Sequence, residues 1–151
     1  MPHTPGGMLY LSQWGSLSSA TQIAFIALKA GKAADLGIEP EVNRAWAEQQ
    51  INYALGSSGR SYLIGYGDNY PLRPHHRGSS CLDLPEVCDD GWALNQPGPN
   101  PQVLYGALVG GPDMSDGYTD ERSDYVHNEV SVGGNTGFTS ALAALTSLRQ
   151  A

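Results

Sequence analysis

Residues 57–99 form a long stretch with neither helical nor alternating periodicity, and glycine and proline interrupt it repeatedly. Within residues 65–78 the interruptions are Gly65, Gly67, Pro71, Pro74 and Gly78. Compact domains use loops this long chiefly to build binding or catalytic surfaces. Because apolar residues elsewhere recur at three- and four-residue spacing, we expect an all-α fold in which long loops carry the chemistry.

The helical pattern is confined to separate segments. They are residues 18–30, 40–56, 103–109, 125–130 and, from about Phe138, 138–148. Ser18 or Ser19 is suited to cap the first, and Pro40 to open the second. Asn100-Pro101 predicts the start of the third, which Gly110 closes. No internal repeat and no series of alternating strands accompanies them.

Composition excludes several classes of function. The chain has 151 residues, which is one domain or a piece of a larger one, and a formal net charge of -7. Its 8 basic residues against 15 acidic ones argue against a nucleic-acid partner, because phosphate contacts need clustered Lys and Arg. No apolar run approaches the roughly 20 residues that cross a membrane, and residues 1–7 do not resemble a secretory signal. A neutral substrate fits this balance.

The two cysteines leave two readings open. Cys81 and Cys88 are seven residues apart, which allows a local disulfide in an oxidising compartment and equally allows two free thiols. A zinc site that adds His75 and His76 is disfavoured, because the spacing lacks the paired arms of structural zinc sites.

The loop of residues 57–99 has the composition of a carbohydrate site. It combines aromatic faces with directional hydrogen-bond donors. These residues are Tyr62, Tyr66, Asn69, Tyr70, Arg73, His75, His76 and Arg77. From composition alone, the favoured interpretation is still an ordinary loop in which Arg and His are solvated and tyrosines provide packing.

A second loop and the segment after it are rich in carboxylates. They are Asp113, Asp116, Asp120, Glu121, Asp124 and Glu129. Clustered carboxylates raise one another's pKa, which suits a general acid, and glycoside hydrolysis needs two carboxyl groups. An acidic solvated turn or a calcium loop is the alternative, although the spacing does not match an EF-hand. No ligand set is specific enough to name a cofactor, and calcium stays open.

Two long motifs resemble the signatures of the family 9 glycoside hydrolases. The first covers residues 61–77, SYLIGYGDNYPLRPHHR. The second is matched by Tyr118, Thr119, Asp120, Tyr125, Glu129, Ser131, Asn135 and Thr136. The flanking runs at residues 6–16, 53–56 and 106–113 agree with the same family, so the resemblance spans nearly the whole chain.

The resemblance implies part of an (α/α)6 barrel and an endo-β-1,4-glucanase that hydrolyses cellulose with inversion. Glu129 would be the general acid, and Asp120 a second active-site carboxylate that orients neighbours and tunes Glu129. His75 and Arg77 would hydrogen-bond sugar hydroxyls beside the cleavage point, and Tyr125 would lie near the sugar path. A secreted enzyme acting on a β-1,4-glucan outside the cell is expected.

Two departures qualify this expectation. Gly133-Gly134 stands where the family usually has Asp-Tyr, which predicts a looser loop and weaker sugar contact. The family's Asp-Ala-Gly-Asp segment, which carries the catalytic base, has no counterpart, since Asp89-Asp90-Gly91 lies elsewhere. Residues 1–151 are therefore expected to be the C-terminal portion of a catalytic domain, inactive without the N-terminal part. The alternative is a non-catalytic carbohydrate-binding remnant.

Overall fold

The computed structural model describes residues 1–31 and 39–150, and within these ranges the regular elements are helical. They are α1 (Ser16–Ala30), α2 (Pro40–Asn52), the π-helix η2 (Tyr53–Ser57), α3 (Arg77–Ser80), α4 (Asp90–Asn95), α5 (Tyr125–Asn128) and α6 (Val132–Arg149). Extended segments in the described part meet only through isolated β-bridges. Among the described helices, none has the length and apolar character needed to cross a bilayer. The all-α expectation is confirmed.

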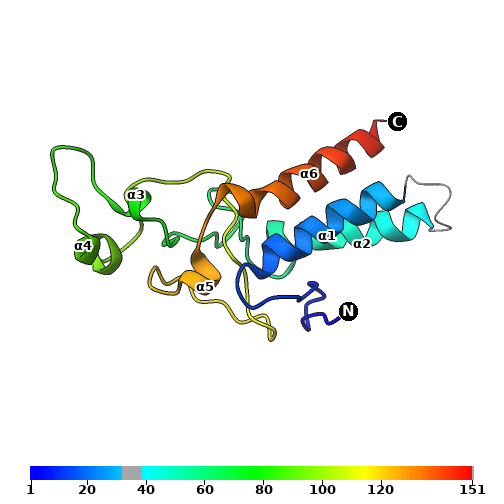
Figure 1. Cartoon of the computed structure of the whole chain (residues 1–151), viewed down its shortest axis with the longest axis horizontal. Helices are drawn as coiled ribbons and strands as arrows, with labels where there is room; N and C mark the ends of the chain where they lie inside the picture. Colours follow the sequence, from blue (N-terminus) through cyan, green and yellow to red (C-terminus); the bar gives the residue numbers. More distant parts are fainter. Residues whose placement is uncertain (32–38, 151) are drawn as a thin grey trace.

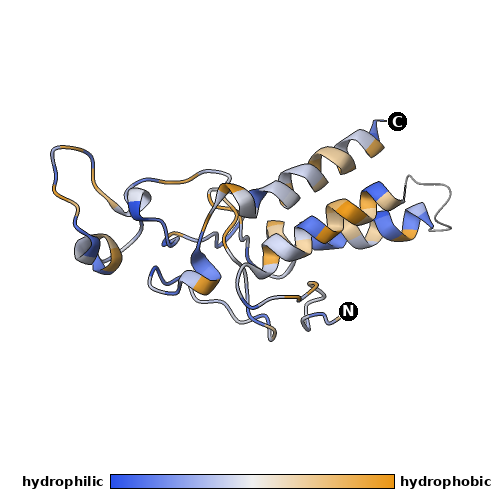
Figure 2. Cartoon of the chain, in the orientation of Figure 1, coloured by the Kyte–Doolittle hydropathy of each residue, from blue (hydrophilic) through white to orange (hydrophobic). Residues whose placement is uncertain are grey.

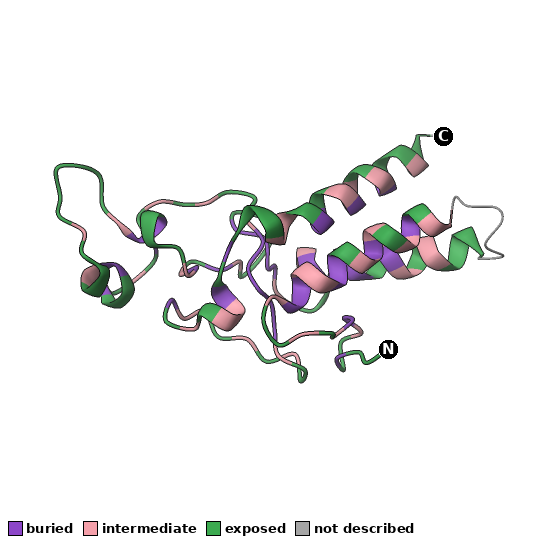
Figure 3. Ribbon diagram, in the orientation of Figure 1, coloured by how far each residue is buried: buried purple, intermediate pink, exposed green. Residues whose placement is uncertain are grey.

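Helix α1 lies between α2 and α6 and packs against both (Figure 1). It buries Leu17, Ala20, Ala24 and Leu28 at three- and four-residue spacing, so a single apolar stripe faces its neighbours (Figure 2). The approach of α6 depends on Gly137, because a Cβ there would lie 2.4 Å from the backbone nitrogen of Gln22. Buried residues accordingly gather on the facing sides of these helices (Figure 3).

Two predicted helix starts are wrong. Helix α1 begins at Ser16, before Ser18 and Ser19, because the carbonyl of Gly110 accepts the Leu17 N–H at 2.9 Å and so satisfies a free amide of the first turn. Helix α6 begins at Val132 and not near Phe138.

The glycine pair Gly133-Gly134 lies in the first turn of α6 and not in a loosened loop. The Ser131 hydroxyl caps this helix by accepting the Gly134 N–H at 2.9 Å. A local cap therefore fixes the backbone where the glycines alone would predict mobility.

The predicted helix over residues 103–109 is also wrong. Residues 105 and 106 form a turn, in which Ala107 N donates to Leu104 O at 3.0 Å, and the backbone of residues 107–109 pairs with residues 62–64. Ile64 N donates to Ala107 O at 2.9 Å, and Val109 N donates to Tyr62 O at 3.2 Å. Long-range pairing has overridden the local capping signal, because the buried Leu108 and Val109 join the main core only in this conformation.

The segment of residues 107–111 lies between the two loops and pairs with both. One side pairs with residues 62–64, and the other meets the chain around α5. Gly111 N donates to His127 O at 2.9 Å, and Val109 is bridged to Val130. Gly110 is required at this crossing, because a Cβ would lie 2.7 Å from Val126 O. The backbone of Glu129, which lies between these contacts at His127 and Val130, is thereby held against the core.

Candidate active site

Glu129 directly follows α5 and has an extended backbone with φ -63° and ψ 139°. It forms a parallel bridge with His75, whose N–H donates to Asn128 O at 2.8 Å. Asn128 is fully buried, and its side-chain amide donates to Thr119 O at 2.9 Å. A buried anchor on one side and paired backbone on the other thus present the exposed Glu129 carboxylate from a rigid position.

The Trp14 ring contacts the Glu129 carboxylate, and the rings of Tyr125 and His75 follow it in a row. The Trp14 indole Nε1–H donates to Glu129 Oε2 at 2.8 Å. The Trp14 ring lies 5.1 Å from the Tyr125 ring, and the Tyr125 ring lies 5.9 Å from His75, centroid to centroid. Both Trp14 and Tyr125 are about half exposed, at 54% and 47%. Exposed rings beside an exposed carboxylate form a surface suited to the apolar face of a sugar.

A pocket of about 220 Å³ opens beside this carboxylate. It is lined by Trp14, Gly15, Ser18, Ser19, Leu108, Val109, Gly110, Glu129, Ser131 and Gly134. The walls come from the start of α1, the extended segment at residue 108 and the start of α6. The corrected helix starts at Ser16 and Val132 therefore shape this pocket.

A hydrogen bond to a backbone carbonyl orients the His75 ring. Its Nδ1 lies 2.7 Å from the carbonyl oxygen of Arg122. Since a carbonyl only accepts, Nδ1 carries the proton and donates it, and in the described part of the chain Nε2 makes no hydrogen bond. The imidazole thereby keeps one polar atom for a ligand.

Arg77 lies in a second pocket, of about 230 Å³, which His75 also lines. The Arg77 Nε–H donates to Asp90 Oδ1 at 2.5 Å, and its Nη2 donates to Cys88 O at 2.9 Å. The structure therefore brings the predicted His75 and Arg77 together. His75 pairs through its backbone with Glu129, which lines the first pocket.

Asp120 acts on the backbone near His75. Its carboxylate accepts the N–H groups of Leu72 and Arg73 at 2.8 and 3.0 Å, so it holds the loop that leads to His75. Among the described residues it makes no hydrogen bond to Glu129. Both expected roles of Asp120, the orientation of its neighbours and the tuning of Glu129, stay predictions.

The other carboxylates of the acidic segment bind separate partners and not one another. Asp113 accepts the N–H groups of Ser115 and Gly117, both at 2.8 Å. Asp116 accepts the Tyr53 hydroxyl at 2.5 Å and the Gly6 N–H at 2.6 Å. Burial opposes ionisation of Asp116, but these hydrogen bonds and one from Thr4 lower its pKa overall. The carboxylates that shape the loop are thus distinct from Glu129.

Two residues of the site are missing from the sequence-based prediction. Trp14, 115 positions before Glu129, gives no local signal of its contact. Arg122 is 3% exposed, and its guanidinium donates to Asn100 Oδ1, Gln96 O and Gly98 O at 2.7, 2.9 and 3.0 Å. Burial lowers the pKa of Arg122, and the nearby Arg73 lowers it further. The available signal was its place as the one Lys or Arg within residues 113–129.

The pair Cys81 and Cys88, left open by the sequence, forms a disulfide with a Cα–Cα distance of 5.6 Å. His75 and His76 do not join these cysteines in a zinc site. Among the described residues no group of three or more His, Cys, Asp or Glu side chains is arranged to hold a metal ion.

Residues 1–142 match the sequence profile described as "Glycosyl hydrolase family 9". The chain belongs to this family. It is 43% identical over 150 residues to Endoglucanase B of Cellulomonas fimi, covering 96% of this chain and 14% of that protein. The chain thus spans only a small part of that family 9 relative.

Solved family 9 structures agree with the fold. An endoglucanase from the termite Nasutitermes takasagoensis superposes with a TM-score of 0.91 and 53% identity, over 99% of this chain and 34% of that one. Endoglucanase CelQ from Clostridium thermocellum, complexed with cellotriose, gives a TM-score of 0.79 and 41% identity, over 97% of this chain and 24% of that one. The expected part of an (α/α)6 barrel is confirmed.

Proposed function

We propose that this chain supplies the general acid and part of the sugar-binding surface of an endo-β-1,4-glucanase. Glu129 protonates the leaving glycosidic oxygen, and His75, Arg77 and Tyr125 contact the sugar. In this scheme an inverting mechanism also needs a carboxylate base on the opposite face of the sugar ring. We assign that base to the part of the domain that corresponds to the rest of the family 9 relatives.

The observation that carries this proposal is the setting of Glu129. An exposed carboxyl group on a rigid, backbone-paired segment is accessible to a substrate, and a general acid must lie within hydrogen-bond reach of the leaving oxygen. The half-exposed rings of Trp14 and Tyr125 supply a face for the sugar. CelQ, a relative, is complexed with cellotriose in its solved structure.

The two candidate functions differ in a simple assay. We expect residues 1–151 alone to release no measurable reducing sugar from carboxymethylcellulose, whereas the longer family 9 domain that contains them should do so. Proton NMR of the fresh products should show the α-anomer first, as inversion requires. A longer domain that binds cello-oligosaccharides without cleaving them would support the carbohydrate-binding alternative. Robust hydrolysis by residues 1–151 would mean that the base lies within the chain.

The contact between Trp14 and Glu129 gives a further prediction. In the active domain, Trp14→Phe keeps the ring beside Tyr125 but removes the N–H that holds Glu129 Oε2. We expect kcat on cellotetraose to fall about tenfold, the equivalent of roughly 1.4 kcal/mol of lost orientation. Trp46→Phe is the matched control, because that indole lies away from Glu129 and contacts His3. Equal kcat values for Trp14→Phe and the wild type would exclude the orienting role.

We also propose that the protein acts outside the cell. The Cys81–Cys88 disulfide supports this, because such bonds persist in oxidising compartments. Recovery of the protein from the culture medium of its source cells, with the disulfide intact by mass spectrometry, is the test. Exclusive recovery from the cell lysate would contradict secretion.

A further inference from the structure

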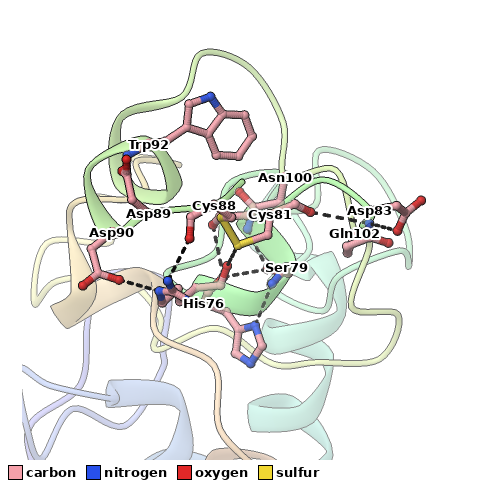
Figure 4. Close-up of a disulfide and its surroundings, with 12 residues drawn as sticks. His76, Ser79, Cys81, Asp83, Cys88, Asp89, Asp90, Trp92, Asn100 and Gln102 are labelled. Carbon is pink, nitrogen blue, oxygen red and sulfur yellow. Dashed lines mark hydrogen bonds and ion pairs between the residues drawn. A yellow bond between two sulfur atoms is a disulfide. The ribbon is translucent and has the colours of Figure 1, made fainter. Parts of the chain in front are cut away.

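Two ties join α3 to the start of α4. The first is covalent: Cys81 directly follows α3, and its disulfide partner Cys88 lies just before the Asp89 cap of α4. Figure 4 shows this bond beside Asp89 and Asp90. The second tie is polar, because Arg77, the first residue of α3, donates to Asp90 Oδ1 at 2.5 Å and to Cys88 O at 2.9 Å. Arg77 thus contacts the same short segment that the disulfide holds.

The α3 side of these ties is firmly anchored. Ser79 is buried, and its hydroxyl accepts the side-chain N–H of Asn100 at 2.7 Å. The Ser79 N–H donates to His76 Nδ1 at 3.1 Å, and Ser79 O accepts the Gln102 N–H at 3.0 Å (Figure 4). The backbone of Arg77 therefore starts from a fixed position, and only the orientation of its long side chain remains to be set.

The loop between α3 and α4 has few contacts besides the disulfide. Every residue from 82 to 87 is exposed, and Leu84 and Val87 reach 93% and 86%. One hydrogen bond ties this loop to the rest of the described chain through a side chain, from Gln102 Nε2 to Asp83 Oδ1 at 2.9 Å. The Arg77–Asp90 pair is itself exposed, and such pairs contribute little stability. The ion pair alone is therefore too weak to hold the two segments together, and the disulfide adds a covalent tie between them.

We propose that the disulfide-closed loop of residues 81–88, together with Asp90, positions the Arg77 guanidinium for the sugar. Cys81, Cys88 and Asp90 are then positioning residues. With Nε and one Nη2 N–H fixed by Asp90 and Cys88, the remaining N–H groups of Arg77 are oriented within the pocket that His75 also lines. Pre-orientation of a flexible arginine lowers the entropy lost on binding, so its removal weakens binding more than turnover. The part that concerns the sugar rests on the proposed function.

Kinetics of the active domain test whether the disulfide and Asp90 act on the substrate through Arg77. We expect Cys81→Ser/Cys88→Ser and, separately, Asp90→Ala to raise KM for cellotetraose about fivefold, with kcat changed less than about twofold. In an Arg77→Lys background, removal of the disulfide should change KM less than about twofold, because the coupled partner is already lost. Leu84→Ser, at the exposed tip of the loop, is the control and should leave both constants unchanged. An equal rise in KM in both backgrounds would overturn the proposal in favour of general structural support.

An NMR measurement decides the positioning without any activity. In protein labelled with ¹⁵N-arginine, the Arg77 Nε–H signal, assigned by its loss in Arg77→Lys, should be dispersed and protected from exchange. It should move to the solvent-exposed position in Asp90→Ala, which removes the acceptor, and in the disulfide-free variant, while the buried Arg122 signal serves as the internal standard for folding. An unchanged Arg77 signal in Asp90→Ala, which keeps the disulfide, would refute the positioning even if the double cysteine variant does not fold. Absence of glucan hydrolysis with the expected NMR result would refute the proposed function alone.

Discussion

Glu129→Gln in the active domain should lower kcat on carboxymethylcellulose by about 10² to 10⁴, the range that a general acid contributes. The leaving alkoxide of a sugar is a poor leaving group, and an amide cannot protonate it. The fold should persist, because the amide oxygen can still accept the Trp14 N–H that now reaches Glu129 Oε2 at 2.8 Å. Initial rates of reducing-sugar release and the circular dichroism spectrum are the two measurements.

A substrate with an activated leaving group distinguishes the loss of acid catalysis from other causes of a lower hydrolysis rate. In an aryl cellobioside such as the 2,4-dinitrophenyl compound, the phenolate leaves without protonation. Glu129→Gln should therefore hydrolyse this substrate at close to the wild-type rate. Glu121→Gln is the matched control. Glu121 lies in the same acidic segment and pairs with Arg73 at 3.4 Å. Its loss should leave the hydrolysis rates of both substrates nearly unchanged. Equal loss on the polymer and on the aryl substrate would exclude Glu129 as the acid.

The sequence predicted those parts of the fold whose stability is local. The apolar stripe of α1 and the proline at the start of α2 are local features, and both helices are present. The helix expected over residues 103–109 failed because Leu108 and Val109 pair with a segment more than 40 residues earlier. Capping rules act within one turn of helix and carry no information about such pairing.

The same division applies to the site. His75, Arg77, Asp120 and Glu129 lie within long motifs, and the structure groups His75 with Arg77 in one pocket and with Glu129 through the backbone. The Trp14 contact could not be predicted, because nothing near residue 14 indicates that it meets residue 129. A motif identifies which side chains take part in the chemistry. The residues that hold them come from distant segments and are determined only by tertiary packing.

Arg122→Met should be the most destabilising of the substitutions considered, by about 3 kcal/mol or more. The Arg122 guanidinium donates to Gln96 O, Gly98 O and Asn100 Oδ1. Methionine would leave two buried acceptors and one partly buried acceptor, Gly98 O, without their donor. Each buried acceptor left unsatisfied costs roughly 1–3 kcal/mol, less where water enters. Urea unfolding followed by circular dichroism measures the loss.

The control is Arg149→Met, since Arg149 is an exposed arginine that pairs with Glu48 at the end of α6. Its loss should cost less than about 1 kcal/mol, as for other surface ion pairs. Arg122→Lys should resemble Arg122→Met, because one ammonium group cannot reach all the acceptors that the planar guanidinium spans. If Arg122→Met and Arg149→Met unfolded at the same urea concentration, the network would not stabilise the fold. The loops that place His75 through the carbonyl of Arg122 would then need another anchor.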